Sequence, residues 1–131
     1  MIGIDTNVLV RYFAQDDPKQ SAIAQRLIER SLSPQAPGHV SLAALAELAW
    51  VLRTRFDAAK DIVTHLLADE RVAVQSQPAV WAALDAYRHA AVDFADALIA
   101  ALDRAQGCTH TVTFDRRAAR LEGMTLLAPT S

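Results

Sequence analysis

The stretch Met1-Ile2-Gly3-Ile4-Asp5-Thr6-Asn7 decides the fold, because an uncharged strand-forming run stops there at a carboxylate. The run Ile2-Gly3-Ile4 predicts a short strand that is covered on both faces, as in a parallel sheet. Asp5-Thr6-Asn7 contains the residues that commonly cap helices, so a helix is expected over 6–12. Ligands of open parallel sheets bind beyond the carboxyl ends of the strands, which is where Asp5 is expected. Capping alone is the alternative role for Asp5.

Strand and helix patterns alternate along the rest of the chain. Strands are expected at 39–41, 71–75, 109–113 and 125–127. Helices are expected after Asp16-Asp17-Pro18, at 42–55 with Ser41 as its cap, and at 58–68, 79–90, 94–105 (ended by Gly107) and 116–121. This alternation predicts an α/β fold, with a central parallel sheet of four to five short strands flanked by helices. The length of 131 residues, without repeats, predicts a single domain, 1–131.

Composition limits the classes of protein that remain. With 52% hydrophobic and 21% charged residues the chain is globular, and no apolar run is long enough to span a membrane. The N-terminus lacks the features of a secretion signal, so a cytoplasmic protein is expected. Cys108 is the single cysteine, which excludes an internal disulfide and a cysteine zinc cage. The net charge of −2 gives no bulk attraction to nucleic acid.

Glu47 is the only charged residue between Leu42 and Leu52. The neighbours expected to be mostly buried are Leu45, Leu48, Val51 and Leu52. An isolated ionised carboxylate among them is costly unless a positive group compensates it, and no Lys or Arg lies one helical turn away. A tertiary contact or a metal ion is therefore expected beside Glu47. Pairing with a distant Arg is the alternative.

Asp96 repeats this pattern in the apolar segment 94–102. Asp93 is assigned to capping this helix, which places Asp96 at the third helical position, where a capping-box acid can reach back to the backbone. Asp115 follows Thr113-Phe114 at the end of a strand and can likewise cap the helix 116–121. Each acid thus has a purely structural explanation when it is taken singly.

Taken together, two acids end strands and two lie in apolar helices, which an α/β sandwich can bring to one rim. Clustered carboxylates repel one another and need cations. Hard oxygen ligands without a cysteine set favour Mg²⁺ or Mn²⁺ over zinc, and the four histidines are scattered: His39, His65, His89 and His110. Such a site suits phosphodiester hydrolysis, because one or two ions hold the phosphate and activate a water.

Four motifs resemble PIN-domain ribonucleases in their order and spacing, over essentially the whole chain. They are Asp5-Thr6-Asn7-Val8-Leu9-Val10-Arg11, the lone Glu47, Asp93-Phe94-Ala95-Asp96-Ala97-Leu98-Ile99-Ala100 and Thr113-Phe114-Asp115. The compact size is similar to that of VapC-type toxins of bacterial toxin–antitoxin pairs.

The resemblance implies a PIN-like three-layer sandwich with Mg²⁺- or Mn²⁺-dependent endoribonuclease activity on structured cellular RNA. It also implies a homodimer and a cognate antitoxin protein that covers the site. The residues that match the family's acidic metal-binding, catalytic positions are Asp5, Glu47, Asp96 and Asp115. Those that match hydrogen-bonding support positions are Thr6, Asn7 and Thr113. Candidate contacts to RNA phosphates are Arg11, Arg116, Arg117 and Arg120.

Other classes fit the same acids less well. A receiver-type phosphoacceptor module expects a paired acid beside the first strand and a late lysine, whereas Thr6 follows Asp5 and the last lysine is Lys60. A phosphatase with an aspartyl nucleophile expects Asp-x-Asp, and Asn7 occupies the second place. The remaining alternative is a catalytically inert PIN-like scaffold that acts by partner binding. Helices 42–55 and 58–68 are expected to supply a dimer face.

Overall fold

The structure, a computed structural model, describes residues 1–54, 56–90 and 92–127. It contains two compact units, Met1–Ser76 and Gln77–Ser131, and each is described by itself. The single domain expected from the length of the chain stays a prediction. Within the described residues, no helix combines the length and the apolar character that a membrane crossing requires.

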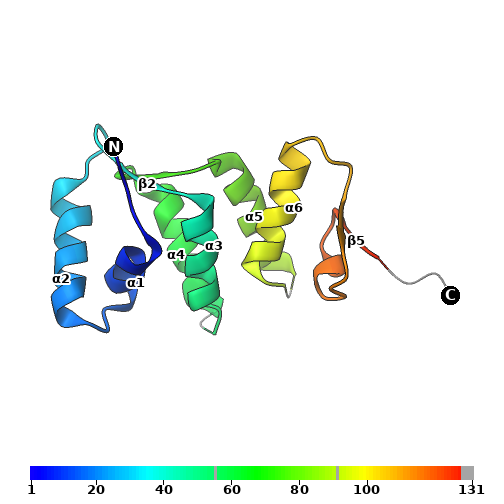
Figure 1. Ribbon diagram of the computed structural model, residues 1–131, viewed down its shortest axis with the longest axis horizontal. Helices are drawn as coiled ribbons and strands as arrows, with labels where there is room; N and C mark the ends of the chain where they lie inside the picture. The colour runs from blue at the N-terminus through cyan, green and yellow to red at the C-terminus, as the bar shows by residue number, and fades with distance from the viewer. Residues whose placement is uncertain (55, 91, 128–131) are drawn as a thin grey trace. The chain divides into compact units, whose positions relative to one another are not determined.

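The first unit is built on three parallel strands in the order β1-β2-β3. The strands are β1 (Ile2–Gly3), β2 (Gly38–Val40) and β3 (Val72–Val74). The helical segments are α1 (Thr6–Ala14), α2 (Pro18–Arg26), the π-helical turn η1 (Leu27–Ser31), α3 (Leu42–Val51) and α4 (Phe56–Ala68). Helix α1 lies between α2 and α3 and packs on both (Figure 1).

The core of this unit explains how β1 is held. Leu9, Val40 and Leu45 are completely buried. Ile4 packs directly over Gly38, where an added Cβ would collide with the Ile4 side chain and would lie 2.9 Å from Leu32 Cδ1. Gly38 is therefore needed for this close approach, which fixes the chain just before Asp5.

The first strand is less covered than its sequence predicts. Ile2 is 51% exposed and Gly3 is also exposed, whereas Ile4 is 5% exposed. The expectation of a strand covered on both faces was wrong for these two residues, which also belong to the outer strand of the sheet β1-β2-β3. Apolar composition alone does not distinguish an outer strand from a central one.

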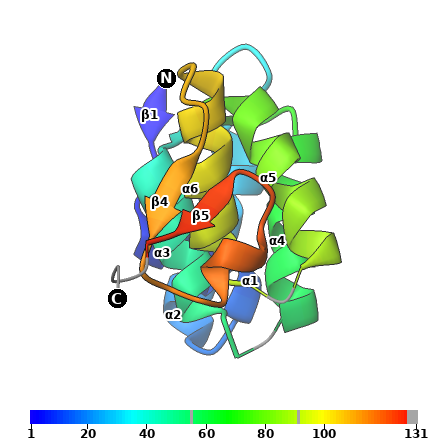
Figure 2. The same cartoon turned by 90° about the vertical axis from the view of Figure 1, so that its right-hand side faces the viewer.

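The second unit contains two long helices, two parallel strands and one short helix. They are α5 (Gln77–His89), α6 (Phe94–Ala105), β4 (Thr111–Thr113), the 3₁₀ helix η2 (Ala118–Arg120) and β5 (Met124–Leu126). Helices α5 and α6 pack side by side (Figure 1). The rings of Tyr87 and Phe94 meet edge to face, with 5.6 Å between the ring centroids. Strands β4 and β5 lie side by side with Thr113 opposite Leu126 (Figure 2).

The α/β class and the parallel pairing agree with the sequence prediction, and the described strands form one sheet in each unit. Several boundaries differ by a few residues. Helix α3 ends at Val51, and the predicted end of that helix, Arg55, lies outside the described residues. Ser41 caps α3 as expected, with its hydroxyl oxygen accepting the Ala44 N–H at 3.1 Å. Gly107 follows α6 with φ of 97°, a conformation that suits glycine.

Candidate active site

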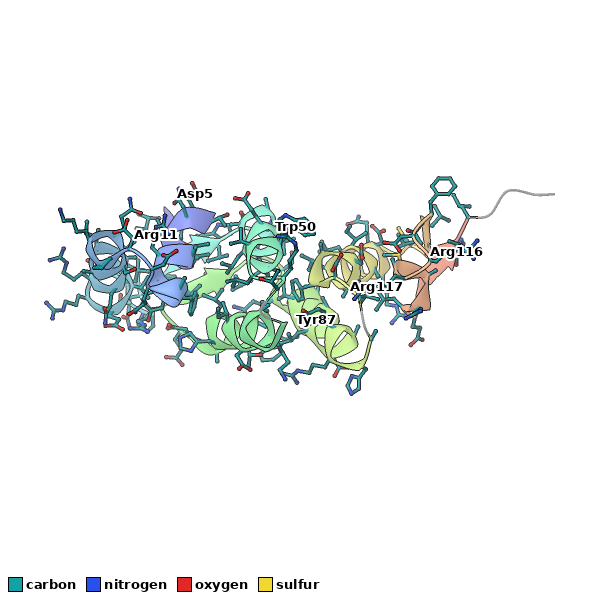
Figure 3. All side chains as sticks on the ribbon, turned by 90° about the horizontal axis from the view of Figure 1, so that it is seen from below. Asp5, Arg11, Trp50, Tyr87, Arg116 and Arg117 are labelled. Carbon is teal, nitrogen blue, oxygen red and sulfur yellow. The ribbon has the colours of Figure 1, made fainter. Side chains whose placement is uncertain are left out.

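Asp5 occupies the N-cap of α1 at the end of β1. Its Oδ1 accepts a hydrogen bond from the Thr6 backbone N–H at 2.8 Å, and its carbonyl oxygen accepts one from Val8 at 3.1 Å. The expected capping role is therefore present. The carboxylate is nevertheless exposed and points away from the ribbon (Figure 3), so it can also bind a ligand from solvent.

Helix α3 begins at the same edge of the sheet as α1. Strands β1 and β2 are parallel neighbours, and the Ile4 N–H donates to the His39 carbonyl oxygen at 2.9 Å. The carboxyl ends of the two strands therefore lie together, with Asp5 after one and Ser41 after the other. Glu47 stands about one and a half turns into α3.

Glu47 is exposed, which contradicts the expectation of a costly buried charge. The buried face of α3 carries Leu45 and Leu48, both 0% exposed, whereas Val51 is 46% exposed and shares the opposite side with Glu47. The helical period separates these two faces, so the carboxylate is hydrated and needs no compensating cation. Exposure leaves it accessible as a ligand.

The Asp96 carboxyl has a raised pKa. Burial raises the pKa of its carboxyl, and the charges of Asp93 and then Asp115 raise that pKa further, whereas Arg117 lowers it. The carboxylates of Asp93, Asp96 and Asp115 therefore act on one another within the second unit. This is mutual repulsion among three acids of the second unit, and the convergence of all four candidate acids at one rim stays a prediction.

Asp93 differs from its predicted role. It stands at the N-cap of α6, and its carbonyl oxygen accepts the Asp96 N–H at 3.0 Å, but its side chain makes no capping hydrogen bond. The assignment of this side chain to capping was wrong, because the backbone carbonyl alone starts the helix. Asp93 instead adds negative charge near Asp96. The i, i+3 spacing of these acids on one helix face was the available signal in the sequence.

Asp115 is held by a turn between β4 and η2. Its backbone N–H donates to Thr113 Oγ1 at 3.0 Å. Its own Oδ1 accepts from the N–H groups of Arg117 at 2.8 Å and Ala118 at 3.3 Å. Capping and positioning are thus combined in Asp115, and Oδ1 accepts both of these capping hydrogen bonds.

The remaining candidates of the first unit have different surroundings. Thr6 is buried and donates its backbone N–H to Asp5. Asn7 is exposed and lines a groove of about 460 Å³ on α1 and α2, so its support role stays a prediction. The Arg11 guanidinium is already engaged, because it donates to Gln20 Oε1 at 2.7 Å and to Asp16 Oδ1 at 2.8 Å. An RNA contact by Arg11 must compete with those two partners.

Three arginines follow Asp115 closely, namely Arg116, Arg117 and Arg120. All three are exposed. Arg116 and Arg117 extend from the segment that follows β4 (Figure 3). This unit therefore places positive charge directly beside the acids that repel one another.

The chemistry of the donors fits a hard divalent cation, because all four candidates supply carboxylate oxygen. Asp5 and Glu47 belong to the first unit, and Asp96 and Asp115 belong to the second. Over the residues described, neither unit alone groups three or more metal-ligating side chains around a common point. Metal binding thus stays a proposal that rests on the donor chemistry.

A family model describing the PIN domain matches residues 2–124 of this chain. The chain belongs to the PIN-domain family. PIN domains are generally nucleases that typically use divalent metals, and the matched range contains all four candidate acids. A search of the curated proteins found no match. The resemblance to PIN domains is therefore confirmed at the level of the family.

Proposed function

We propose that this PIN-domain protein is a Mg²⁺- or Mn²⁺-dependent endoribonuclease that hydrolyses phosphodiester bonds in structured cellular RNA. We further propose that it is the VapC-type toxin of a toxin–antitoxin pair. The observation that supports the nuclease most directly is the Asp96 carboxyl, which is partly buried among like charges that raise its pKa. Such crowding destabilises a protein and is typical of functional sites.

In this proposal Asp5, Glu47, Asp96 and Asp115 hold the metal. A bound divalent ion lowers the pKa of a water and offsets charge on the leaving oxygen. The chain itself fixes the ligands: the Thr6 N–H holds Asp5, and the Thr113 hydroxyl holds the backbone of Asp115. One of the carboxylates can accept the proton of the attacking water.

The arginines after Asp115 are proposed to bind the phosphates on either side of the scissile bond. Arg116 and Arg120 are exposed and suited to bidentate contacts. Arg117 also lies close enough to lower the pKa of Asp96, so it can act on both the RNA and the acid.

The proposed partners are a cognate antitoxin, which blocks the acids in the inhibited complex, and a second copy of the chain in a homodimer. The apolar surface of α3 supports a dimer face, since Trp50 is 56% exposed and Val51 is 46% exposed. A cytoplasmic location follows from the same proposal, because the RNA substrates of a toxin are there. Sedimentation of the purified chain tests the dimer, which a monomer at micromolar concentration would contradict.

Cleavage of total RNA by the purified chain tests the nuclease proposal. The reactions contain Mg²⁺ or Mn²⁺, or a chelator, and compare the parent protein with Asp5→Asn and with the matched control Asp61→Asn on the exposed side of α4. We expect discrete fragments only with metal and with an intact Asp5, and no effect of Asp61→Asn. Absence of both cleavage and metal binding in all three proteins would instead favour the inert scaffold.

A further inference from the structure

Phe114 is exposed at a position where an aromatic ring is unexpected. It lies between Thr113 and Asp115, and 79% of its surface is exposed. An exposed hydrophobic side chain is ordinary by itself. What distinguishes Phe114 is its attachment to the candidate acid Asp115 and to the arginines that follow.

The backbone on both sides of Phe114 is fixed by hydrogen bonds. The Asp115 N–H donates to Thr113 Oγ1 at 3.0 Å, and the Leu127 N–H donates to the Thr113 carbonyl oxygen at 2.7 Å. Asp115 Oδ1 then accepts the Arg117 N–H at 2.8 Å. Phe114 is thus presented on a constrained turn, which reduces the entropy lost when its ring binds a ligand.

Arginines that can bind the phosphates of a polyanion follow this ring in the chain, and the acids Asp93 and Asp96 act on Asp115 in the same unit. Arg116 and Arg120 are exposed, and both lie within six residues of Phe114. The nearest acid along the chain, Asp115, has one oxygen engaged with two backbone N–H groups. Glu122 lies 3.7 Å from Arg104, which offsets its charge. An exposed aromatic ring with exposed arginines close to it in the sequence is the composition of surfaces that bind unpaired nucleotides.

We infer that Phe114 is a base-stacking residue that holds one unpaired RNA base beside Asp115, while Arg116 and Arg120 contact neighbouring phosphates. The inference rests on the proposed function and adds a requirement to it: the RNA must offer an unstacked base at this point. Bases inside an A-form duplex are stacked on both faces and cannot meet the ring.

Binding of short labelled oligoribonucleotides tests the inference, with a chelator present so that the RNA stays intact. Three probes are compared by fluorescence anisotropy: a mixed-sequence single strand, the same strand with abasic nucleotides throughout, and the duplex. The variants are Phe114→Ala, Phe114→Trp and the control Val112→Ala, whose parent side chain is 52% exposed on the neighbouring strand β4. Thermal unfolding establishes that each variant folds.

We expect Phe114→Ala to weaken binding of the ordinary single strand roughly 5- to 150-fold, the range of one base–aromatic stack. Phe114→Trp should retain the affinity, and Val112→Ala should leave it unchanged. The abasic strand should bind Phe114→Ala and the parent equally, because its phosphates remain while its bases are gone. A plot of the logarithm of affinity against the logarithm of salt concentration has a slope set by the number of phosphate contacts. Arg116→Ala and Arg120→Ala should each lower the magnitude of this slope by roughly 0.7 on both single strands.

Equal loss of affinity for ordinary and abasic strands in Phe114→Ala would overturn the inference, as would a loss of affinity in Phe114→Trp that equals the loss in Phe114→Ala. Unchanged affinity in Phe114→Ala, with a change in sedimentation, would assign the ring to a protein interface and would also overturn it. These results leave the proposed nuclease intact if the parent protein cleaves RNA with metal. If the parent neither binds nor cleaves RNA, the proposed function and the inference fail together.

Discussion

Thr113 holds Asp115 through a hydrogen bond, in which Thr113 Oγ1 accepts the Asp115 backbone N–H at 3.0 Å. The bond closes the turn that leads from β4 into η2. It therefore connects the end of a strand, which the sheet positions, to a carboxylate that is proposed to act on the RNA. The Thr113 hydroxyl is therefore placed to act on the proposed metal site through Asp115.

Removing this hydroxyl should weaken the site without unfolding the protein. We predict that Thr113→Val lowers Mn²⁺-dependent cleavage roughly 10- to 100-fold, as for groups that orient metal ligands, with a stability loss of about 1 kcal/mol. Thr113→Ser keeps the acceptor and should retain most of the activity. Equal activity of the Val variant and the parent would exclude this positioning role.

Asp96→Asn should stabilise the metal-free protein. The folded-state pKa of Asp96 is raised above its unfolded value, so ionisation at neutral pH opposes folding and the penalty disappears below the unfolded pKa of about 3.9. We predict a gain of at most about 1 kcal/mol at pH 7, because solvent screens this partly exposed carboxyl, and a smaller gain at pH 4, measured by urea unfolding with chelator present. Asp61→Asn is the control. A loss of stability at pH 7 would contradict the repulsion.

Arg117 should set the pH at which metal begins to bind. Its charge lowers the pKa of Asp96, so Arg117→Ala should raise that pKa further and make protons compete more strongly with the metal. We predict that the midpoint of Mn²⁺ binding against pH moves to higher pH by calorimetry, and that Arg116→Ala leaves it in place. If the midpoint of Mn²⁺ binding moved to lower pH in Arg117→Ala, the proposed effect of Arg117 on Asp96 would be refuted.

A separate ion pair should control the acid stability of the first unit. Asp69 Oδ1 accepts a hydrogen bond from Arg71 Nε at 2.9 Å, and Asp69 Oδ2 accepts one from Arg71 Nη2 at 2.8 Å. The Asp69 side chain is 9% exposed. The hydrogen bonds from the Arg71 side chain hold the pKa of Asp69 below its usual value. The pair therefore stabilises the fold above the unfolded pKa of about 3.9, and this contribution is lost as the pH falls through the lower, folded-state pKa.

We predict that Asp69→Asn lowers the free energy of unfolding by about 1–3 kcal/mol at pH 7. The difference in this free energy between the variant and the parent should narrow toward pH 2. Urea unfolding across this pH range provides the measurement, with the exposed neighbour Glu70→Gln as the control. A constant difference at all pH values would show that packing, not charge, supports this contact.

Local patterns in the sequence predicted most of the elements for physical reasons that the structure confirms. Ser41 caps α3, and Gly107 follows α6 with positive φ. Each of these signals acts within a few residues, so a single sequence contains all the information that is needed. The α/β class follows from the order of the elements.

Features that depend on tertiary contacts were predicted less well. Ile2 lies on an outer strand and is exposed, although its sequence resembles that of a covered strand. Glu47 interrupts an apolar segment but lies on the exposed face of α3. Asp93 starts α6 through its carbonyl oxygen, which leaves its carboxylate near Asp96. The exposure of Ile2 is decided by its neighbours in space, whereas Glu47 and Asp93 show that a local sequence pattern is compatible with more than one side-chain environment.

The central claim is that Asp5, Glu47, Asp96 and Asp115 serve the same metal-dependent cleavage of RNA. The most direct measurement is the rate of cleavage against Mn²⁺ concentration for four single variants, Asp5→Asn, Glu47→Gln, Asp96→Asn and Asp115→Asn, beside Asp61→Asn. We predict that each of the four lowers the rate by roughly 100-fold, while Asp61→Asn stays near the parent. A parent rate that does not depend on Mn²⁺, or full activity in any of the four, would contradict the claim.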